Sequence, residues 1–372
     1  MDVLIHYILP FFGMLIGLIV IHELGHYVTA KLFGVKVLEA GLGYPPRAWG
    51  FTWKGTIYSI NWLPLGGFVR LLGEEDPTDP QSLAAQKAWK RLIILGSGAF
   101  MNALLPIVLF ATFFMIPHNI PKGPAVITTV EAGSPAQAAG LQQGDIILKI
   151  DGTTIKNLTD ASQQIRLHMG QTVDFTIQRD SFGETQVLDA NVQARWAPPS
   201  GQGPTGIQIR DRVAGSAICQ GNSPPSQCYE RESYSFLGAI DKGWHSTIDS
   251  LRLARNQVIA MFKGGSGPAV AGPAGIAQGT GEVVKQNGWD ALLEFAALLS
   301  INLAIINVLP LPMLDGGRMT FVLIEIARRG KRIAPEKEAI VHLVGLALII
   351  TFALVVTYVD VARIIGGKSI FS

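Results

Sequence analysis

Two histidines and one glutamate lie within five residues of each other, in the sequence His22-Glu23-Leu24-Gly25-His26. On a helix, residues four apart project from the same face, so both imidazoles can reach one metal ion. Glu23 stands beside them, where its carboxylate can handle a proton. Zinc suits imidazole ligands and can lower the pKa of a bound water molecule toward ~7. The pattern H-E-x-x-H therefore predicts zinc held by His22 and His26.

The position of Glu23 supports this interpretation, because it follows a mostly apolar segment of about the length that crosses a bilayer. A carboxylate at such depth is costly unless it faces a partner or water. The alternative is that the three polar residues only end the segment at an interface, as snorkelling side chains do. Because burying Glu23 at this depth without a partner is costly, the metal site is the favoured interpretation. The other histidines stand alone, and we expect ordinary structural roles for His6, His118, His168, His245 and His342.

A hydrolytic zinc site needs a third protein ligand and leaves its fourth position to water. The candidate is Asp315. It lies in the stretch from Asn302 to Gly317, where an apolar helix meets two prolines and two glycines. Irregular backbone at membrane depth is tolerated only where it is buried in protein or lines a water-filled cavity. The local geometry therefore lets Asp315 face the two histidines. A helix-capping role for Asp315 is the alternative.

Composition indicates that lipid is part of the solvent for this chain. Only 16% of its 372 residues are charged, and the mean hydropathy is +0.32. The 30 Lys and Arg residues nearly balance the 28 Asp and Glu residues, which gives no electrostatic case for a nucleic-acid partner. Two cysteines exclude a disulfide-dense scaffold and Cys-rich zinc modules. A metal must therefore use histidines and carboxylates.

Four apolar segments are long enough to cross a bilayer as helices. The first lacks the basic start and the small-residue cleavage site of a signal peptide, so we expect it to be retained. The fold class predicted is a multi-pass α-helical membrane protein with four transmembrane helices and an inserted α+β domain. The predicted spans run from about Val3 to Phe33, Leu92 to Ile116, Ala291 to Leu309 and Ala339 to Ile365.

Lysine and arginine gather in residues 31–91 and 318–337, which predicts that both stretches are cytoplasmic. Both termini and the long segment 117–290 would then be extracytoplasmic, with the metal site near the cytoplasmic side of the inner (plasma) membrane. Four domains follow. They are an N-terminal membrane core (1–120), an α+β module (121–195), a linker with an amphipathic helix (196–290) and a C-terminal membrane core (291–372).

The module alternates short β-like runs with helical patterns and turn signals. Strands are expected at 125–130, 145–150 and 173–177, and short helices at 134–141 and 157–168. A proline- and glycine-rich break at 198–204 follows, and helical periodicity resumes over Phe236 to Phe262, which could lie on the membrane surface. Cys219 and Cys228 are expected to form a disulfide, because their segment is predicted to be extracytoplasmic.

Taken together, these residues resemble the site-2 protease family of intramembrane zinc metalloproteases, and specifically its bacterial branch of regulator-of-sigma-E proteases. The resemblance covers nearly the whole chain. The motifs that support it are HELGH at 22–26, NVLPLPMLDGG at 307–317, GPAGI at 272–276, and a PDZ-like signature at 133–147 within the module. Many proteases of this branch carry two PDZ domains, whereas one is visible here, so the exact substrate stays open.

The resemblance implies zinc bound by His22, His26 and Asp315, with Glu23 as the general base. It implies cleavage of a peptide bond inside or beside a substrate's transmembrane helix. Asn307 matches a position that helps to bind the substrate or its developing oxyanion, and a helix-packing amide is the alternative. Asn102, on the second span, also falls in a family-like position and is assigned to substrate binding.

Residues 51–71 match the family's membrane-associated β-loop on the cytoplasmic side. An exposed strand there could hold a substrate segment once it is unwound, and an ordinary surface hairpin is the alternative. The resemblance also implies partners: transmembrane-helix substrates such as a pre-trimmed anti-sigma factor or signal-peptide remnants, the lipid bilayer, and an upstream site-1 protease acting on the same substrate. We expect the PDZ-like domain to exclude bulky substrates, and peptide capture is its competing role.

Two other classes of function compete with the protease. A non-catalytic membrane-anchored PDZ scaffold would explain residues 121–195, but it leaves Glu23 and Asp315 in apolar surroundings without a purpose. A metal transporter would also use intramembrane histidines and carboxylates, but it would place polar residues along several spans. Here the ionisable cluster lies at one depth.

Overall fold

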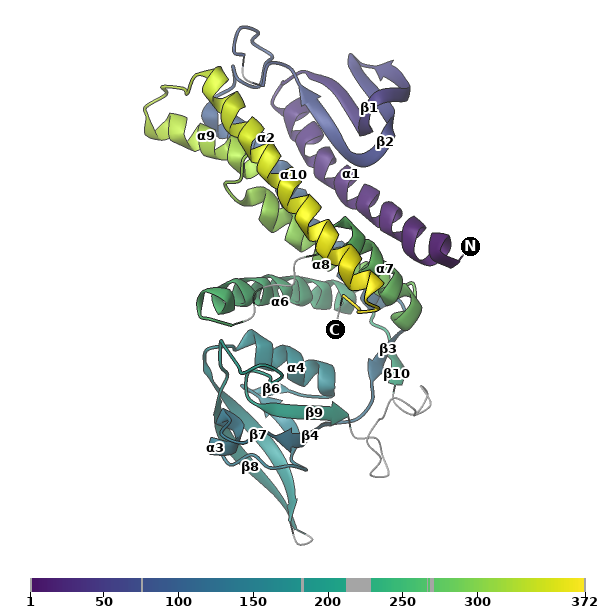
Figure 1. Ribbon diagram of the computed structural model, residues 1–372, viewed down its shortest axis with the longest axis vertical. Helices are drawn as coiled ribbons and strands as arrows, with labels where there is room; N and C mark the ends of the chain where they lie inside the picture. The colour runs from purple at the N-terminus through teal and green to yellow at the C-terminus, as the bar shows by residue number, and fades with distance from the viewer. Residues whose placement is uncertain are drawn as a thin grey trace. The chain divides into compact units, whose positions relative to one another are not determined.

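The structure is a computed structural model of the 372-residue chain, and it describes residues 2–74, 76–181, 184–211, 229–265, 267 and 271–370. The chain forms two compact units. The first comprises Met1–Phe113, Ile240–Thr247 and Val270–Ser372, and the second comprises Phe114–Ala239 and Ile248–Ala269. The elements are labelled in Figure 1. Cys219 and Cys228 lie outside the described residues, so their predicted pairing stays a prediction.

Four helices of the described chain are long and apolar enough to cross a membrane, and they coincide with the four predicted segments. The first span begins with a π-helical turn, η1. Large apolar side chains such as Leu343, Leu348 and Leu354 remain exposed on the last helix, as a lipid-facing surface requires. These four helices are η1 with α1 (Leu4–Ile8, Leu9–Leu32), α2 (Ala88–Met115), α8 (Ala291–Val308) and α10 (Pro335–Ile365).

Two further helices belong to the first unit. Helix α7 spans Pro273–Asn287 and α9 spans Asp315–Ala327. The N-terminal end of α7 is held by the buried carboxylate of Asp360 on α10, whose Oδ2 accepts from the N–H groups of Gly272 and Gly275 at 2.8 Å each. Arg363 donates to the other oxygen of Asp360 at 2.9 Å, so this buried charge is paired.

Strands β1 (Val37–Trp53) and β2 (Thr56–Leu71) form the sheet predicted around residues 51–71, and they pack beside α1 (Figure 1). The two-residue turn Lys54-Gly55 has positive φ at both positions, as tight hairpins require. Each strand folds back on itself. Residues 39–42 pair with 57–60 on one side, and residues 37–42 pair with 67–71 on the other. Residues 47–53 pair with 56–61.

The α+β module lies in the second unit, and its predicted strands and helices are confirmed. Its core buries apolar side chains such as Ile127, Ile147, Phe175 and Val192 between the sheet and α4. The sheet has the order β8-β7-β5-β4-β9, with β6 on β5. Its elements are β4 (Ala125–Val130), α3 (Pro135–Ala138), β5 (Ile146–Ile150), β6 (Thr153–Thr154), α4 (Leu158–Leu167), β7 (Thr172–Ser181), β8 (Glu184–Gln193) and β9 (Ile207–Asp211).

One strand of this sheet lies outside residues 121–195. Strand β9 follows the proline-rich break at 198–204 and pairs antiparallel with β4, so the break is a connection within the module. Asp211 at the end of β9 accepts from the N–H of Leu158 at 2.6 Å and caps α4. Burial raises the pKa of Asp211, and the hydrogen bond from Leu158 offsets part of this increase.

The rest of the second unit flanks the module. Strand β3 (His118–Pro121) pairs antiparallel with β10 (Tyr229–Glu232). Helix α6 spans Phe236–Phe262, as its periodicity predicts. In its later part, Asn256 Nδ2 donates to the carbonyls of Arg166 and Leu167 at 3.0 and 2.9 Å, which satisfies the C-terminal end of α4.

Candidate metal centre

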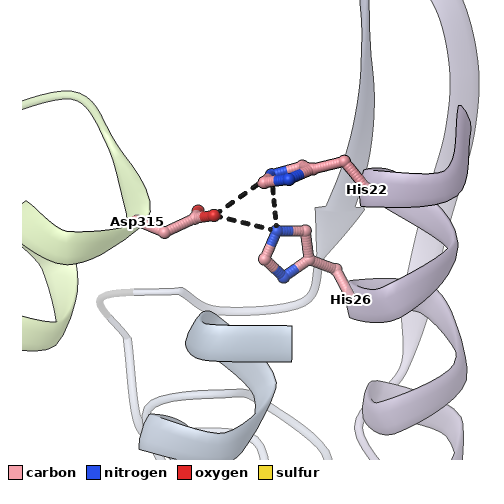
Figure 2. Close-up of side chains that lie close together, drawn as sticks. All are labelled: His22, His26 and Asp315. Atoms are coloured by element: carbon pink, nitrogen blue, oxygen red, sulfur yellow. Dashed lines mark hydrogen bonds and ion pairs between the residues drawn. The ribbon is translucent and has the colours of Figure 1, made fainter. Parts of the chain in front are cut away.

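Helix α1 places the imidazoles of His22 and His26 one above the other, as their spacing predicts. Both side chains are buried, and their Nε2 atoms lie 3.2 Å apart. Figure 2 shows the two rings on α1 facing Asp315 across a short gap. The two nitrogens can therefore bind the same ion.

Asp315 is brought to the histidines from the other end of the sequence. Its Oδ2 lies 3.1 Å from Nε2 of His22 and 3.2 Å from Nε2 of His26. Burial alone would raise the pKa of the Asp315 carboxyl, but the two imidazoles lower it below its usual range, so the ionised form is favoured here. Among the described residues, these three form the one group of histidines and carboxylates close enough to share a metal ion.

The chain after α8 explains how Asp315 reaches this place. Helix α8 ends at Val308, residues 309–314 form a short loop, and Asp315 is the first residue of α9. A Cβ on Gly316 would lie 2.1 Å from the carbonyl oxygen of Leu309, and one on Gly317 would lie 2.2 Å from that of Leu311. Only glycine lets α9 start directly against the loop.

The three donor atoms fit a zinc ion. Ligands at about 2.0–2.1 Å in tetrahedral directions lie roughly 3.3 Å from one another, and the three distances here are 3.1–3.2 Å. Apart from the two imidazoles, the buried Oδ2 of Asp315 has no hydrogen-bond donor among the described residues, and a cation shared with the imidazoles would satisfy it. Two imidazoles and one carboxylate are the ligand set of a hydrolytic site with one open position.

Gly98 on α2 leaves the space that this centre needs. A Cβ at this position would lie 2.4 Å from Nε2 of His26 and 2.6 Å from Nε2 of His22. Such contacts are impossible, so any other residue would displace the imidazoles. Gly98 has no role among the predictions made from the sequence. The available signal was its spacing of four from Asn102, which places both on one face of α2.

The second nitrogen of each imidazole has a partner on α2. Nδ1 of His26 donates to the carbonyl of Ile94 at 2.8 Å, which leaves Nε2 free to bind a metal. Nδ1 of His22 lies 3.2 Å from the amide nitrogen of Asn102. The amide oxygen of Asn102 is buried without a hydrogen-bond partner among the described residues. Rotating the amide by half a turn lets this oxygen accept from Nδ1 of His22, which frees Nε2 of His22 as well.

The two asparagines assigned to substrate binding lie in different settings. Asn102 is fully buried against His22, and its backbone carbonyl accepts from Ser300 of α8 at 2.8 Å. Asn307 lies near the end of α8, and its Nδ2 donates to the carbonyl of Leu303 at 3.0 Å, one turn back on the same helix. A substrate contact stays a prediction for both residues.

Glu23 lies on α1 between the two histidines, next to β2. A Cβ on Gly67 would lie 3.5 Å from Cγ of Glu23 and 2.8 Å from a methyl group of Ile19. The segment 67–71 of β2 therefore packs closely on α1 beside the carboxylate. Tyr27 and Lys31 fix the same sheet further along α1, with hydrogen bonds to Tyr58 (2.6 Å) and Thr56 (2.9 Å).

The family model for peptidase family M50 matches residues 10–352. The chain belongs to this family, the site-2 proteases. A relative from Clostridium perfringens is 34% identical over 351 residues, which cover 93% of this chain and 95% of its own. Two relatives named zinc metalloprotease RasP, from Oceanobacillus iheyensis and Geobacillus kaustophilus, are 30% and 27% identical and are covered to 97% and 98% of their length.

These similarities confirm the predicted family, the enzyme class and the cofactor. The family is one of peptidases, and the relatives are named for zinc. The match runs from the first span into the last, so it includes the positions of His22, His26 and Asp315.

Proposed function

We propose that this peptidase is an intramembrane zinc endopeptidase that cleaves transmembrane segments of other proteins. The proposal rests on one observation: three ligand atoms from α1 and α9 lie 3.1–3.2 Å from one another, beside helices that are long and apolar enough to cross a membrane. His22, His26 and Asp315 hold the zinc, and Glu23 is the general base.

Zinc at this centre supplies Lewis-acid chemistry, because it polarises a peptide carbonyl and makes water more acidic. The protein's own residues transfer the proton and orient the metal ligands. Glu23 takes a proton from the attacking water and passes it to the leaving amine. Ile94 and Asn102 hold the imidazoles in the orientation and tautomer that bind metal. Gly98 keeps α2 from filling the space next to them.

Segment 67–71 of β2 offers the substrate a place to be extended. Among the described pairings it pairs with 37–42 along one edge, and it packs on α1 beside Glu23. A transmembrane helix has all its backbone groups bonded internally, so it must be unwound before its peptide bond can be attacked. A strand edge supplies hydrogen bonds to the unwound form. This favours β-addition of the substrate next to the general base.

The proposal includes the biological setting. The enzyme is a multi-pass protein of the inner membrane, with both termini and the PDZ-like domain outside the cytoplasm. Its substrates are membrane proteins already trimmed by another protease, such as an anti-sigma factor, or signal-peptide remnants. The proposal is supported by the charge distribution around the spans and by the family.

The test combines zinc content with cleavage of a model transmembrane peptide by the purified protein in liposomes. We expect about one zinc per chain in the wild type, as a three-ligand site of this kind binds. Asp315→Ala should lose both zinc and cleavage, while Asp241→Ala, which changes an exposed aspartate on α6, should lose neither. Zinc without cleavage, together with zinc flux across the liposome, would favour a transporter. Neither zinc nor cleavage in the wild type would favour a scaffold.

A further inference from the structure

The loop that carries Asp315 has an unusual backbone. Residues 309–314 include Pro310 and Pro312, which have no N–H to donate. Met313 has a φ of +70°, a left-handed conformation that residues with a Cβ disfavour. Such a conformation persists only where its surroundings hold it. Some contact must therefore keep this loop in the shape that presents Asp315.

Helix α10 supplies such a contact through His342. The N–H of Met313 donates to Nδ1 of His342 at 2.9 Å. His342 is buried, although it lies in a helix whose neighbouring side chains are mostly exposed and apolar. Its Nε2 lies 3.9 Å from the carboxylate of Glu338, one turn earlier. That carboxylate favours the tautomer with the proton on Nε2, which leaves Nδ1 as the acceptor that Met313 requires.

The same face of α10 receives the proline beside Met313. A Cβ on Gly345 would lie 2.1 Å from Cβ of Pro312, so only glycine lets the proline ring rest on the helix. The ring of Phe321, on α9, also packs against His342 with centroids 5.4 Å apart. One face of α10 thus contacts the loop at two successive residues and also touches the helix that begins with Asp315.

We propose that His342 and Gly345 are positioning residues for the metal centre. By fixing Met313 and Pro312, they hold the carboxylate of Asp315 at the distance from His22 and His26 that zinc needs. This inference rests on the proposed metal site, and it replaces the ordinary role that the sequence led us to expect for His342. A purely structural contact would affect folding but would leave the zinc affinity of the folded protein unchanged.

The test compares His342→Leu with His342→Asn in the full-length protein. Leucine fills the site but accepts no hydrogen bond, whereas the side-chain oxygen of asparagine lies where Nδ1 was and can accept from Met313. Zinc affinity is measured by competition with a chromophoric chelator at fixed pH. We expect His342→Leu to bind zinc 10- to 100-fold more weakly, the range found for residues that orient metal ligands. His342→Asn should stay within about threefold of the wild type, because it restores the acceptor.

Gly345→Ala tests the second contact independently, and it covers the case in which His342→Leu does not fold. Alanine favours helix more than glycine does, so α10 should form, but its Cβ pushes Pro312 and the loop away. We expect weaker zinc binding with an unchanged helix content by circular dichroism. Gly13→Ala is the matched control, because a Cβ there has no atom within 4 Å among the described residues.

The outcomes separate this inference from the proposed function. If the wild type binds zinc and Asp315→Ala does not, the metal site stands. If His342→Leu or Gly345→Ala then folds and binds zinc as tightly as the wild type, the positioning role of that residue is refuted. If Asp315→Ala keeps its zinc, the metal site itself is wrong, whatever the α10 variants do. Reduced affinity in the folded variants, with rescue by His342→Asn, supports the inference.

Discussion

Gly98 shows how strongly a single residue without a side chain can shape the proposed metal centre. The two imidazoles approach its Cα so closely that the smallest side chain would lie 2.4 Å from a ligand nitrogen. Cores are packed at crystal density, so neither α1 nor α2 can yield by the needed distance without cost. Metal binding therefore depends on the absence of a side chain at this position.

This gives a prediction for Gly98→Ala. The added methyl group displaces His22 and His26, so we expect zinc affinity to fall by at least 10-fold and cleavage to fall with it. Gly96→Ala is the matched control on the same helix, because its Cβ would meet only the flexible end of Met319, at 3.5 Å. Zinc content and peptide cleavage are measured for both. Equal zinc content in the two variants would show that the site tolerates the methyl group.

At the residue level, the sequence predicted three side chains that the structure brings together, those of His22, His26 and Asp315. His22 and His26 could be found because their spacing places them on one helical face, and Asp315 because its backbone is broken by prolines and glycines. Glu23 was assigned from its place beside His22 in the motif, and its role stays a prediction. Gly98 and His342 could not be found in the same way. A glycine in an apolar helix and a lone histidine each have many ordinary roles, and only tertiary packing shows that they surround Asp315 and its partners.

At the scale of elements, Glu39 binds the β1–β2 sheet together. Its Oε1 accepts from Arg47 and Ser59 at 2.7 Å each, and its Oε2 accepts from Arg70 at 3.0 Å. These partners lie on the other three paired segments of the folded hairpin. Burial of Glu39 would raise its pKa, but the hydrogen bonds from Ser59 and Arg47 and the two arginine charges lower it overall. The ionised form therefore stabilises the sheet.

A pH dependence follows from the direction of this shift. Because the folded state lowers the pKa of Glu39, its contribution is complete above the ordinary glutamate pKa of about 4.3 and is lost as pH falls through the lower folded value. Glu39→Gln should destabilise the sheet by about 1–3 kcal/mol near neutral pH and should remove this part of the acid sensitivity. Thermal unfolding followed by tryptophan fluorescence measures the stability of this sheet, since Trp49, Trp53 and Trp62 lie in it.

The control is Glu336→Gln, which changes an exposed glutamate on α10. Identical acid sensitivity of Glu39→Gln and the wild type would contradict this role.

The elements themselves were largely predictable. Long apolar runs specify the four long helices, and alternating patterns specify β4, β5 and β7. Strand β9 was missed because residues 198–204 read as the end of the module, whereas the chain returns to pair with β4. The double pairing of β1 and β2 was missed as well, since a local pattern gives the strand period but not the distant partner.

For the whole molecule, the proposed cleavage of membrane helices requires selective access to the active site, because a peptidase that cut every membrane helix would damage its own membrane. Along the chain, the module lies between α2 and α8, and the helices that carry the candidate metal ligands, α1 and α9, come before α2 and after α8. A folded insertion of this kind favours a size filter. Peptide capture in the module is the alternative role.

Two substrates with the same transmembrane segment test this role with the intact enzyme. One keeps a folded extracytoplasmic domain, and the other is trimmed close to the membrane. A filter predicts at least 10-fold faster cleavage of the trimmed substrate, equivalent to about 1.4 kcal/mol. Capture predicts that trimming slows cleavage, and equal rates would refute both roles.

The proposed mechanism requires that Glu23 moves protons at a zinc centre built by His22, His26 and Asp315. The most direct measurement is zinc content and peptide cleavage of Glu23→Gln beside the wild type. Glutamine keeps the shape of glutamate but cannot accept the proton, so we expect one zinc per chain in both proteins and a loss of cleavage on the order of 10²–10⁴-fold. Cleavage by Glu23→Gln at the wild-type rate would rule out Glu23 as the general base. Cleavage by a zinc-free wild type would rule out the zinc mechanism.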